Sequence, residues 1–143
     1  MSAPIVVERE VAAAPSVVYS YLTESSKWAR WQGIDATIQA RAGGIFAVTM
    51  PNGTRARGQF IELEHNRRIV FSWGWIDHEG LPPGSSTVEI ELTPLEGGTL
   101  VRLTHRGLPL EEVELHTAGW HRDLPRLGLA AEGGQPEPDS LPT

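Results

Sequence analysis

The side chains of this sequence best suited to chemistry are its five tryptophans and two of its five histidines. Trp73 and Trp75 follow Phe71 on one face of a segment with strand-like alternation. An indole offers a broad apolar face and one N–H donor, so these rings could stack on an aromatic or lipid-like ligand. Ordinary core packing is the alternative. We favour it for Trp120, which lies on the apolar stripe of a predicted helix.

His105 is the first candidate for acid–base chemistry. It shares one face of a predicted strand with Val101 and Leu103, so it is expected to point toward the core. There it could serve as a hydrogen-bonding group or as a general acid or base with a pKa near neutrality. A histidine with its hydrogen bonds satisfied inside the core is the commoner case, so His105 remains a weak catalytic candidate. His116, on the predicted C-terminal helix, is the second candidate.

We expect no metal and no cofactor. His116 and His121 are five residues apart, whereas a zinc pair on a helix is spaced four apart. The absence of cysteine excludes disulfides, thiolate metal sites and cysteine nucleophiles. Nucleophile elbows and phosphate-binding glycine loops are also missing from the sequence. Glu89 and Glu91 should face outward on a strand as solvated charges, and His78, in a predicted loop, should be solvated too.

Composition narrows the possible partners. With 12 basic and 18 acidic residues, the net charge is -6, which argues against nucleic acid. No stretch reaches the roughly 18 apolar residues of a membrane span, and no secretory signal is visible, so we expect a cytoplasmic protein without a membrane partner. The length and a hydrophobic content of 40% predict one domain over residues 1–131. The glycine-, proline- and acid-rich tail, residues 132–143, is predicted to be disordered.

The periodicity predicts a strand, two short helices, six more strands and a long helix. The opening strand covers residues 5–11, Pro15 begins the first helix, and the second helical stretch places Trp28 and Trp31 on one face. The long helix covers residues 110–131 and contains Pro125, near which a kink is expected. Alternating apolar residues predict strands over 36–41, 46–50, 54–64, 67–76, 88–92 and 99–106.

This order of elements is an α+β arrangement in which a long amphipathic helix covers one face of an antiparallel sheet. Seven segments then carry a family resemblance: W-A-R-W at 28–31, G-G-I-F-A-V-T-M-P-N-G at 43–53, G-Q-F-I-E-L-E at 58–64, R-R-I-V-F-S-W-G-W at 67–75, S-T-V-E-I-E-L-T-P at 86–94, G-G-T-L-V-R-L-T-H-R-G-L-P at 97–109 and H-T-A-G-W at 116–120. Together they resemble the START-like (SRPBCC) superfamily. Within it, the sequence is most similar to the family named after the activator of the heat-shock-protein-90 ATPase, which includes stand-alone bacterial domains.

The resemblance implies a helix-grip fold of the Bet v type, with a curved sheet of six or seven strands wrapped around the C-terminal helix. It also implies an apolar cavity between sheet and helix. In the H-T-A-G-W segment, we expect Gly119 to let the helix approach the sheet closely and His116 to bond to a neighbouring loop. The residues expected to line the cavity are Trp28, Trp31, Phe46, Val48, Met50, Phe60, Phe71, Trp73, Trp75, His105, His116, Trp120 and Leu124.

Three functions are compatible with the resemblance. The leading hypothesis is binding or transport of a hydrophobic or aromatic small molecule, without catalysis. The first alternative is an enzyme like the polyketide cyclases and aromatases, with His105 as acid or base. The second is a protein-interaction module that activates a chaperone ATPase. A homodimer is also expected to be possible, and the sequence leaves the identity of the ligand open.

Overall fold

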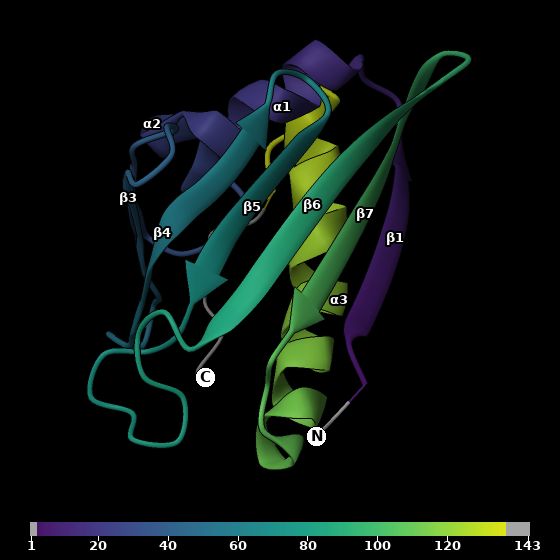
Figure 1. Ribbon diagram of the computed structural model, residues 1–143. Helices are drawn as coiled ribbons and strands as arrows, with labels where there is room; N and C mark the ends of the chain where they lie inside the picture. The colour runs from purple at the N-terminus through teal and green to yellow at the C-terminus, as the bar shows by residue number, and fades with distance from the viewer. Residues whose placement is uncertain (1–2, 137–143) are drawn as a thin grey trace.

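The computed structural model describes residues 3–136 and confirms the predicted order of elements (Figure 1). The last part of the predicted tail, residues 137–143, lies outside the described residues. The elements are β1 (Ile5–Val11), α1 (Pro15–Thr23), α2 (Ser25–Trp28), β2 (Asp35–Ile38), β3 (Ile45–Thr49), β4 (Arg55–Glu64), β5 (Arg68–Trp73), β6 (Ser86–Leu95), β7 (Gly98–Arg106) and α3 (Leu110–Ala131).

The seven strands form one antiparallel sheet in the order β1-β7-β6-β5-β4-β3-β2. Strand β1 therefore forms one edge of the sheet and pairs with β7, with Ile5 opposite His105 and Val11 opposite Thr99. Figure 1 shows α3 running behind β6 and β7, with α1 and α2 grouped at one end of the sheet. A curved antiparallel sheet over a long C-terminal helix, with two short helices after the first strand, is the helix-grip architecture that the resemblance implied.

Alternation along the central strands separates a core face from an outer face. In β6, Val88, Ile90 and Leu92 are buried, as the period-two pattern predicted. Glu89 and Glu91 lie between them on the opposite face. The same rule turns the odd-numbered residues of β7, including His105, toward α3, so one face of the sheet carries the core.

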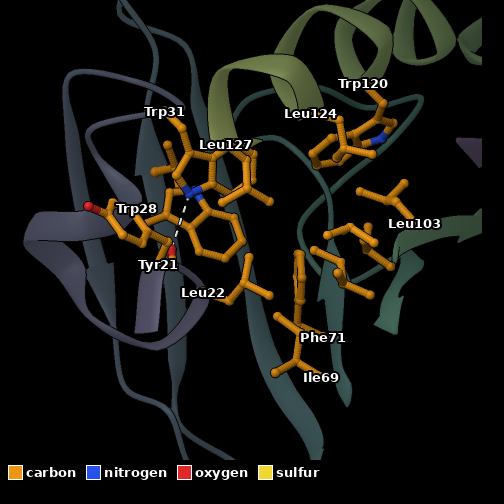
Figure 2. Packing of buried hydrophobic residues seen from close by; sticks show 14 of the residues in the cluster. Tyr21, Leu22, Trp28, Trp31, Ile69, Phe71, Leu103, Trp120, Leu124 and Leu127 are labelled. Atoms are coloured by element: carbon orange, nitrogen blue, oxygen red, sulfur yellow. Dashed lines mark hydrogen bonds between the residues drawn. The ribbon is translucent and has the colours of Figure 1, made fainter. Parts of the chain in front are cut away.

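The core joins side chains from all layers of the fold. Figure 2 shows Trp28 and Trp31, Phe71 of β5 and Leu124 and Leu127 of α3 converging on one another. Trp31 lies just beyond the end of α2, yet its ring remains 4.7 Å from that of Trp28. Within residues 3–136, no helix has the length and apolar character needed to span a membrane.

Strand β4 bends so that its first half pairs with β3 and its second half with β5. The register shifts between Phe60 and Glu62, which marks a bulge. Gly58 makes the bend possible, because a Cβ there would lie only 1.8 Å from the carbonyl oxygen of Ser72. The bend brings the ring of Phe60 to 5.9 Å from that of Phe71.

The predicted end of β5 needs correction. Strand β5 ends at Trp73 and not at residue 76, and Gly74 lies against Pro82, where a Cβ would be 1.8 Å from the carbonyl oxygen. Trp75 keeps only an isolated bridge to Ala56. Helix α3 spans Leu110–Ala131, the predicted bounds, with Pro125 inside it.

Candidate functional site

The structure places the predicted cavity residues together between the sheet and α3. Twelve of the thirteen are buried, and Trp75 is half-buried. Their rings contact one another closely: Phe46 stacks on Phe71 at 4.3 Å, and Trp73 lies 5.2 Å from Trp120. These side chains therefore pack closely against one another between the sheet and α3.

Polar atoms gather at one end of this core. We call the group formed by Trp73, Trp75, His105, His116 and Trp120 the indole–imidazole cluster. Trp73 lies at its centre, with ring centroids 5.3 Å from Trp75, 5.9 Å from His105, 6.2 Å from His116 and 5.2 Å from Trp120. The side chains of the cluster come from β5, from the segment just after β5, from β7 and from α3. The cluster therefore depends on how α3 packs against the sheet.

His105 is bonded at both ring nitrogens. The indole Nε1–H of Trp120 donates to His105 Nδ1 at 3.0 Å, and an indole nitrogen can only donate. The proton of neutral His105 therefore resides on Nε2, which donates to Ser86 Oγ at 2.9 Å. The Ser86 hydroxyl then donates to the carbonyl oxygen of Trp73 at 2.8 Å. This chain of three hydrogen bonds leaves His105 with no free lone pair.

His116 is bonded in the mirror arrangement. Trp75 Nε1 donates to His116 Nε2 at 3.1 Å, so the imidazole proton is on Nδ1 and donates to the carbonyl oxygen of Glu112 at 2.8 Å. The predicted hydrogen bond from His116 to a neighbouring loop is thus present, since Trp75 belongs to the loop between β5 and β6. The two histidines of the cluster are fixed in opposite tautomers by two indoles.

Burial keeps both histidines neutral. It lowers the pKa of His105 to about 3, and the neighbouring His116 acts in the same direction. Burial also lowers the pKa of His116, although the hydrogen bond to the Glu112 carbonyl acts in the opposite direction. A pKa of about 3 is far below the near-neutral value expected of a catalytic histidine, which weakens the case for His105 as a base.

Trp73 differs from the other tryptophans. Its indole Nε1 is fully buried and has no hydrogen-bond partner among the described residues. The other four indoles all donate: Trp75 and Trp120 to the cluster histidines, Trp28 to Gln32 Oε1 at 3.0 Å, and Trp31 to the carbonyl oxygen of Tyr21 at 3.1 Å, the contact dashed in Figure 2. An unpaired buried donor is rare in folded proteins, so the donor of Trp73 makes this cluster the candidate functional site.

Two expectations about individual residues are wrong. His78 is not simply solvated, because its Nε2 lies 3.0 Å from Glu112 Oε2. Gly119 is not needed for close helix approach, since a Cβ there would meet nothing within 4 Å. Gly128 has that role instead: a Cβ there would lie 3.3 Å from Val11 Cγ2 on β1.

The outer-face carboxylates also form pairs that the alternation did not predict. Arg68 bridges Glu62, Glu64 and Glu89, and Arg106 approaches Glu89 at 3.1 Å. Burial alone would raise the pKa of Glu89, but the hydrogen bonds and charges of the two arginines lower it overall. These residues form a structural ion network on the sheet, and no carboxylate pair is left for catalysis there.

Sequence patterns also missed polar residues next to the core. Ser86 and Glu112 bond the cluster histidines, and neither was singled out as a site residue from the sequence. Behind Trp28, the buried Gln32 donates to Asp123 Oδ2 of α3 at 2.9 Å. Ser86 and Gln32 are identified only by their position in the folded chain, because their partners are distant in sequence, whereas Glu112 lies one helical turn before His116.

Two other observations bear on the site. A groove of about 510 Å³ lies on the outer side of the sheet and is lined by Ile45, Arg57, Gln59 and Ser72, so it is separate from the predicted cavity. Among the described residues, no group of three or more histidine, aspartate or glutamate side chains is arranged to hold a metal ion.

The fold and the cluster define a helix-grip domain with an aromatic interior. The family model described as "Activator of Hsp90 ATPase homolog 1-like protein" matches residues 12–132, and the chain belongs to this family. No curated protein matches the sequence.

Solved structures agree with this assignment. An AHSA1-like protein from Rhizobium etli is 40% identical over 100% of this chain and 91% of its own, with a TM-score of 0.73. DynU16, a protein in the dynemicin biosynthetic locus, is 23% identical over 98% of this chain, with a TM-score of 0.83; this chain spans 51% of DynU16. The Aha1 dimer from Colwellia psychrerythraea is 20% identical over 94% of this chain and 100% of its own, with a TM-score of 0.82. The last two likenesses show the fold alone.

Proposed function

We propose that this protein binds a hydrophobic or aromatic small molecule at the indole–imidazole cluster, between the sheet and α3. The observation that carries the proposal is the unpaired, buried Nε1–H of Trp73. Leaving such a donor without a partner costs about 1–3 kcal/mol. A ligand acceptor at this position would remove that cost, while the surrounding rings supply apolar contact.

We propose that a ligand reaches this site by displacing the side chain of Trp75. It is half-buried, whereas Trp73 and Trp120 are each only 2% exposed. One side-chain hydrogen bond, from Trp75 Nε1 to His116, ties its ring to α3. Moving the Trp75 ring would uncover Trp73 without disturbing the strand ladder, since β5 ends at Trp73.

Both alternative functions have weaker support. A cyclase-like reaction needs His105 as base, but its Nδ1 lone pair is used by Trp120 and its pKa is low. Activation of a chaperone ATPase rests on the family description. A relative with this fold is a dimer, and light scattering after size-exclusion chromatography tests whether this chain also pairs.

The test of the proposal is a titration with aromatic, polyketide-like and fatty-acid ligands, followed by intrinsic fluorescence and by the indole N–H signals in ¹H–¹⁵N NMR spectra. We expect a saturable change with at least one ligand class. The indole signals of Trp73 and Trp75 should shift, while that of Trp31, whose donor is bonded outside the cluster, should stay in place. No saturable response with any class, or a response confined to Trp31 and Trp28, would refute the proposal.

A further inference from the structure

The hydrogen-bonding capacity of the indole–imidazole cluster is almost fully used. Both nitrogens of His105 and both of His116 are engaged. The Ser86 hydroxyl accepts from His105 and donates to the Trp73 carbonyl. Trp73 Nε1–H is the one donor of the cluster left over among the described residues.

The cluster also lacks a positive charge. Both histidines are neutral because burial opposes their protonation. Two ionisable groups act on His116: Glu112, whose Oε1 lies 3.7 Å from His116 Nδ1, and His78, which is paired with Glu112 Oε2. A carboxylate bound here would be desolvated without a counter-charge and beside a like charge, which is strongly unfavourable.

From this inventory we infer the ligand class: an uncharged aromatic molecule with one acceptor oxygen, such as a ketone or quinone carbonyl, that accepts from Trp73 Nε1. The inference rests on the proposed function and adds a selectivity to it, against hydrocarbons that lack the acceptor and against carboxylates. The cluster offers the ligand one free hydrogen-bond donor and no cation, which suits a ligand with one neutral acceptor.

A trapped water is a poor substitute for that oxygen. Buried waters usually make about three hydrogen bonds to polar groups that would otherwise be unpaired. Around Trp73, the imidazole nitrogens and the Ser86 hydroxyl already have partners. A water at Nε1 would therefore gain one bond and give up several, whereas a carbonyl oxygen on an apolar ligand needs only one donor.

The experiment compares ligands that differ at one group. Benzophenone, diphenylmethane and diphenylacetate share two rings and carry a carbonyl, no acceptor and a carboxylate, respectively. Acetophenone, ethylbenzene and phenylacetate repeat the comparison on one ring for a tighter site. Dissociation constants are measured by calorimetry for the wild type, Trp73→Phe and Tyr21→Phe, and the ¹H shift of the Trp73 indole is followed in parallel.

We expect the ketone of at least one series to bind about tenfold tighter than its hydrocarbon, the gain from one net hydrogen bond to a buried donor, and the carboxylate to bind weakest. The Trp73 indole proton should move downfield with the ketone alone. Trp73→Phe should bind ketone and hydrocarbon equally, whereas Tyr21→Phe, which removes a bonded hydroxyl outside the cluster, should keep the preference.

The other outcomes separate the two proposals. Equal binding of ketone and hydrocarbon to the wild type would leave the binding site in place and overturn the selectivity. Tightest binding of a carboxylate would also overturn it, since a cation would then have to face the ligand. No binding in either series, with all indole signals unmoved, would overturn the selectivity and the aromatic-ligand function together.

Discussion

The contrast between Trp73 and Trp120 gives the sharpest test of the cluster. The two indoles are equally buried, at 2% exposure each, so replacing either by phenylalanine removes the same atoms from a similar environment. The hydrogen bonds of the two indoles differ. Trp120 Nε1 donates to His105 Nδ1, whereas Trp73 Nε1 has no acceptor among the described residues. Any difference in stability between the variants therefore measures hydrogen bonding more than packing.

The expected gap follows from two contributions of opposite sign. Trp120→Phe leaves the buried Nδ1 of His105 without a donor, which costs about 1–3 kcal/mol beyond the packing loss. Trp73→Phe removes an unpaired buried donor and so recovers about 1–3 kcal/mol of the packing loss. Trp120→Phe should thus be less stable than Trp73→Phe by about 2–6 kcal/mol, a large fraction of a typical domain stability.

Urea denaturation followed by far-UV circular dichroism measures the gap without relying on tryptophan emission. The two variants should have the same m-value, so that the midpoints report stability directly. Equal stabilities, or a less stable Trp73→Phe, would refute the assignment of a bonded Trp120 and an unpaired Trp73. Loss of a distinct Nδ1 nitrogen signal of His105 in Trp120→Phe would confirm which bond was broken.

Three further predictions concern pH and backbone packing. Burial lowers the pKa of His105 from 6.5 to about 3. Below pH 6.5, His105 is therefore protonated in the unfolded state but stays neutral in the folded state, which stabilises the unfolded state. The free energy of unfolding should therefore fall by about 2 kcal/mol between pH 7 and pH 5 in urea titrations, and a flat profile would contradict the neutral His105. Gly119→Ala should raise the free energy of unfolding by about 0.5–1 kcal/mol through helix propensity, since its Cβ meets nothing; a loss would show a contact there. Gly58→Ala should lower the free energy of unfolding by about 2 kcal/mol or more in urea titrations, because its Cβ would collide with the Ser72 carbonyl, and a neutral effect would argue against the bend in β4.

Local patterns were sufficient for the strands and for the direction in which their side chains point. Alternation placed His105 with Val101 and Leu103 on the buried face of β7, because a strand with one buried face leaves no freedom in side-chain direction. The end of β5 was missed because Gly74 packs closely against Pro82 in the following loop. That contact has no periodic signature.

The bonds that define the cluster could not be predicted in the same way. Trp120 reaches His105 only in one register of α3 against β7, and Ser86 meets His105 from the neighbouring strand. Sequence patterns fix which face of a helix is buried, but not how far the helix slides along the sheet. The unpaired donor of Trp73 is likewise visible only after all possible partners have been placed.

The state of His105 also decides between binding and catalysis. As a base it would have to release Trp120 from Nδ1, at the cost of an unpaired buried indole, and it would accept the proton with a pKa of about 3. A base whose protonated form has a pKa some four units below neutral pH has little driving force for proton abstraction, because the efficiency of a general base follows its basicity. The same hydrogen bonds that disable His105 as a base hold Trp120 and the Trp73 backbone in place around the free donor. A His105→Gln variant should therefore lose stability, and any change in ligand affinity should track the displacement of Trp120 in the indole spectrum. A catalysed turnover that disappears in His105→Gln, with the Trp120 signal unmoved, would instead require acid–base chemistry at His105.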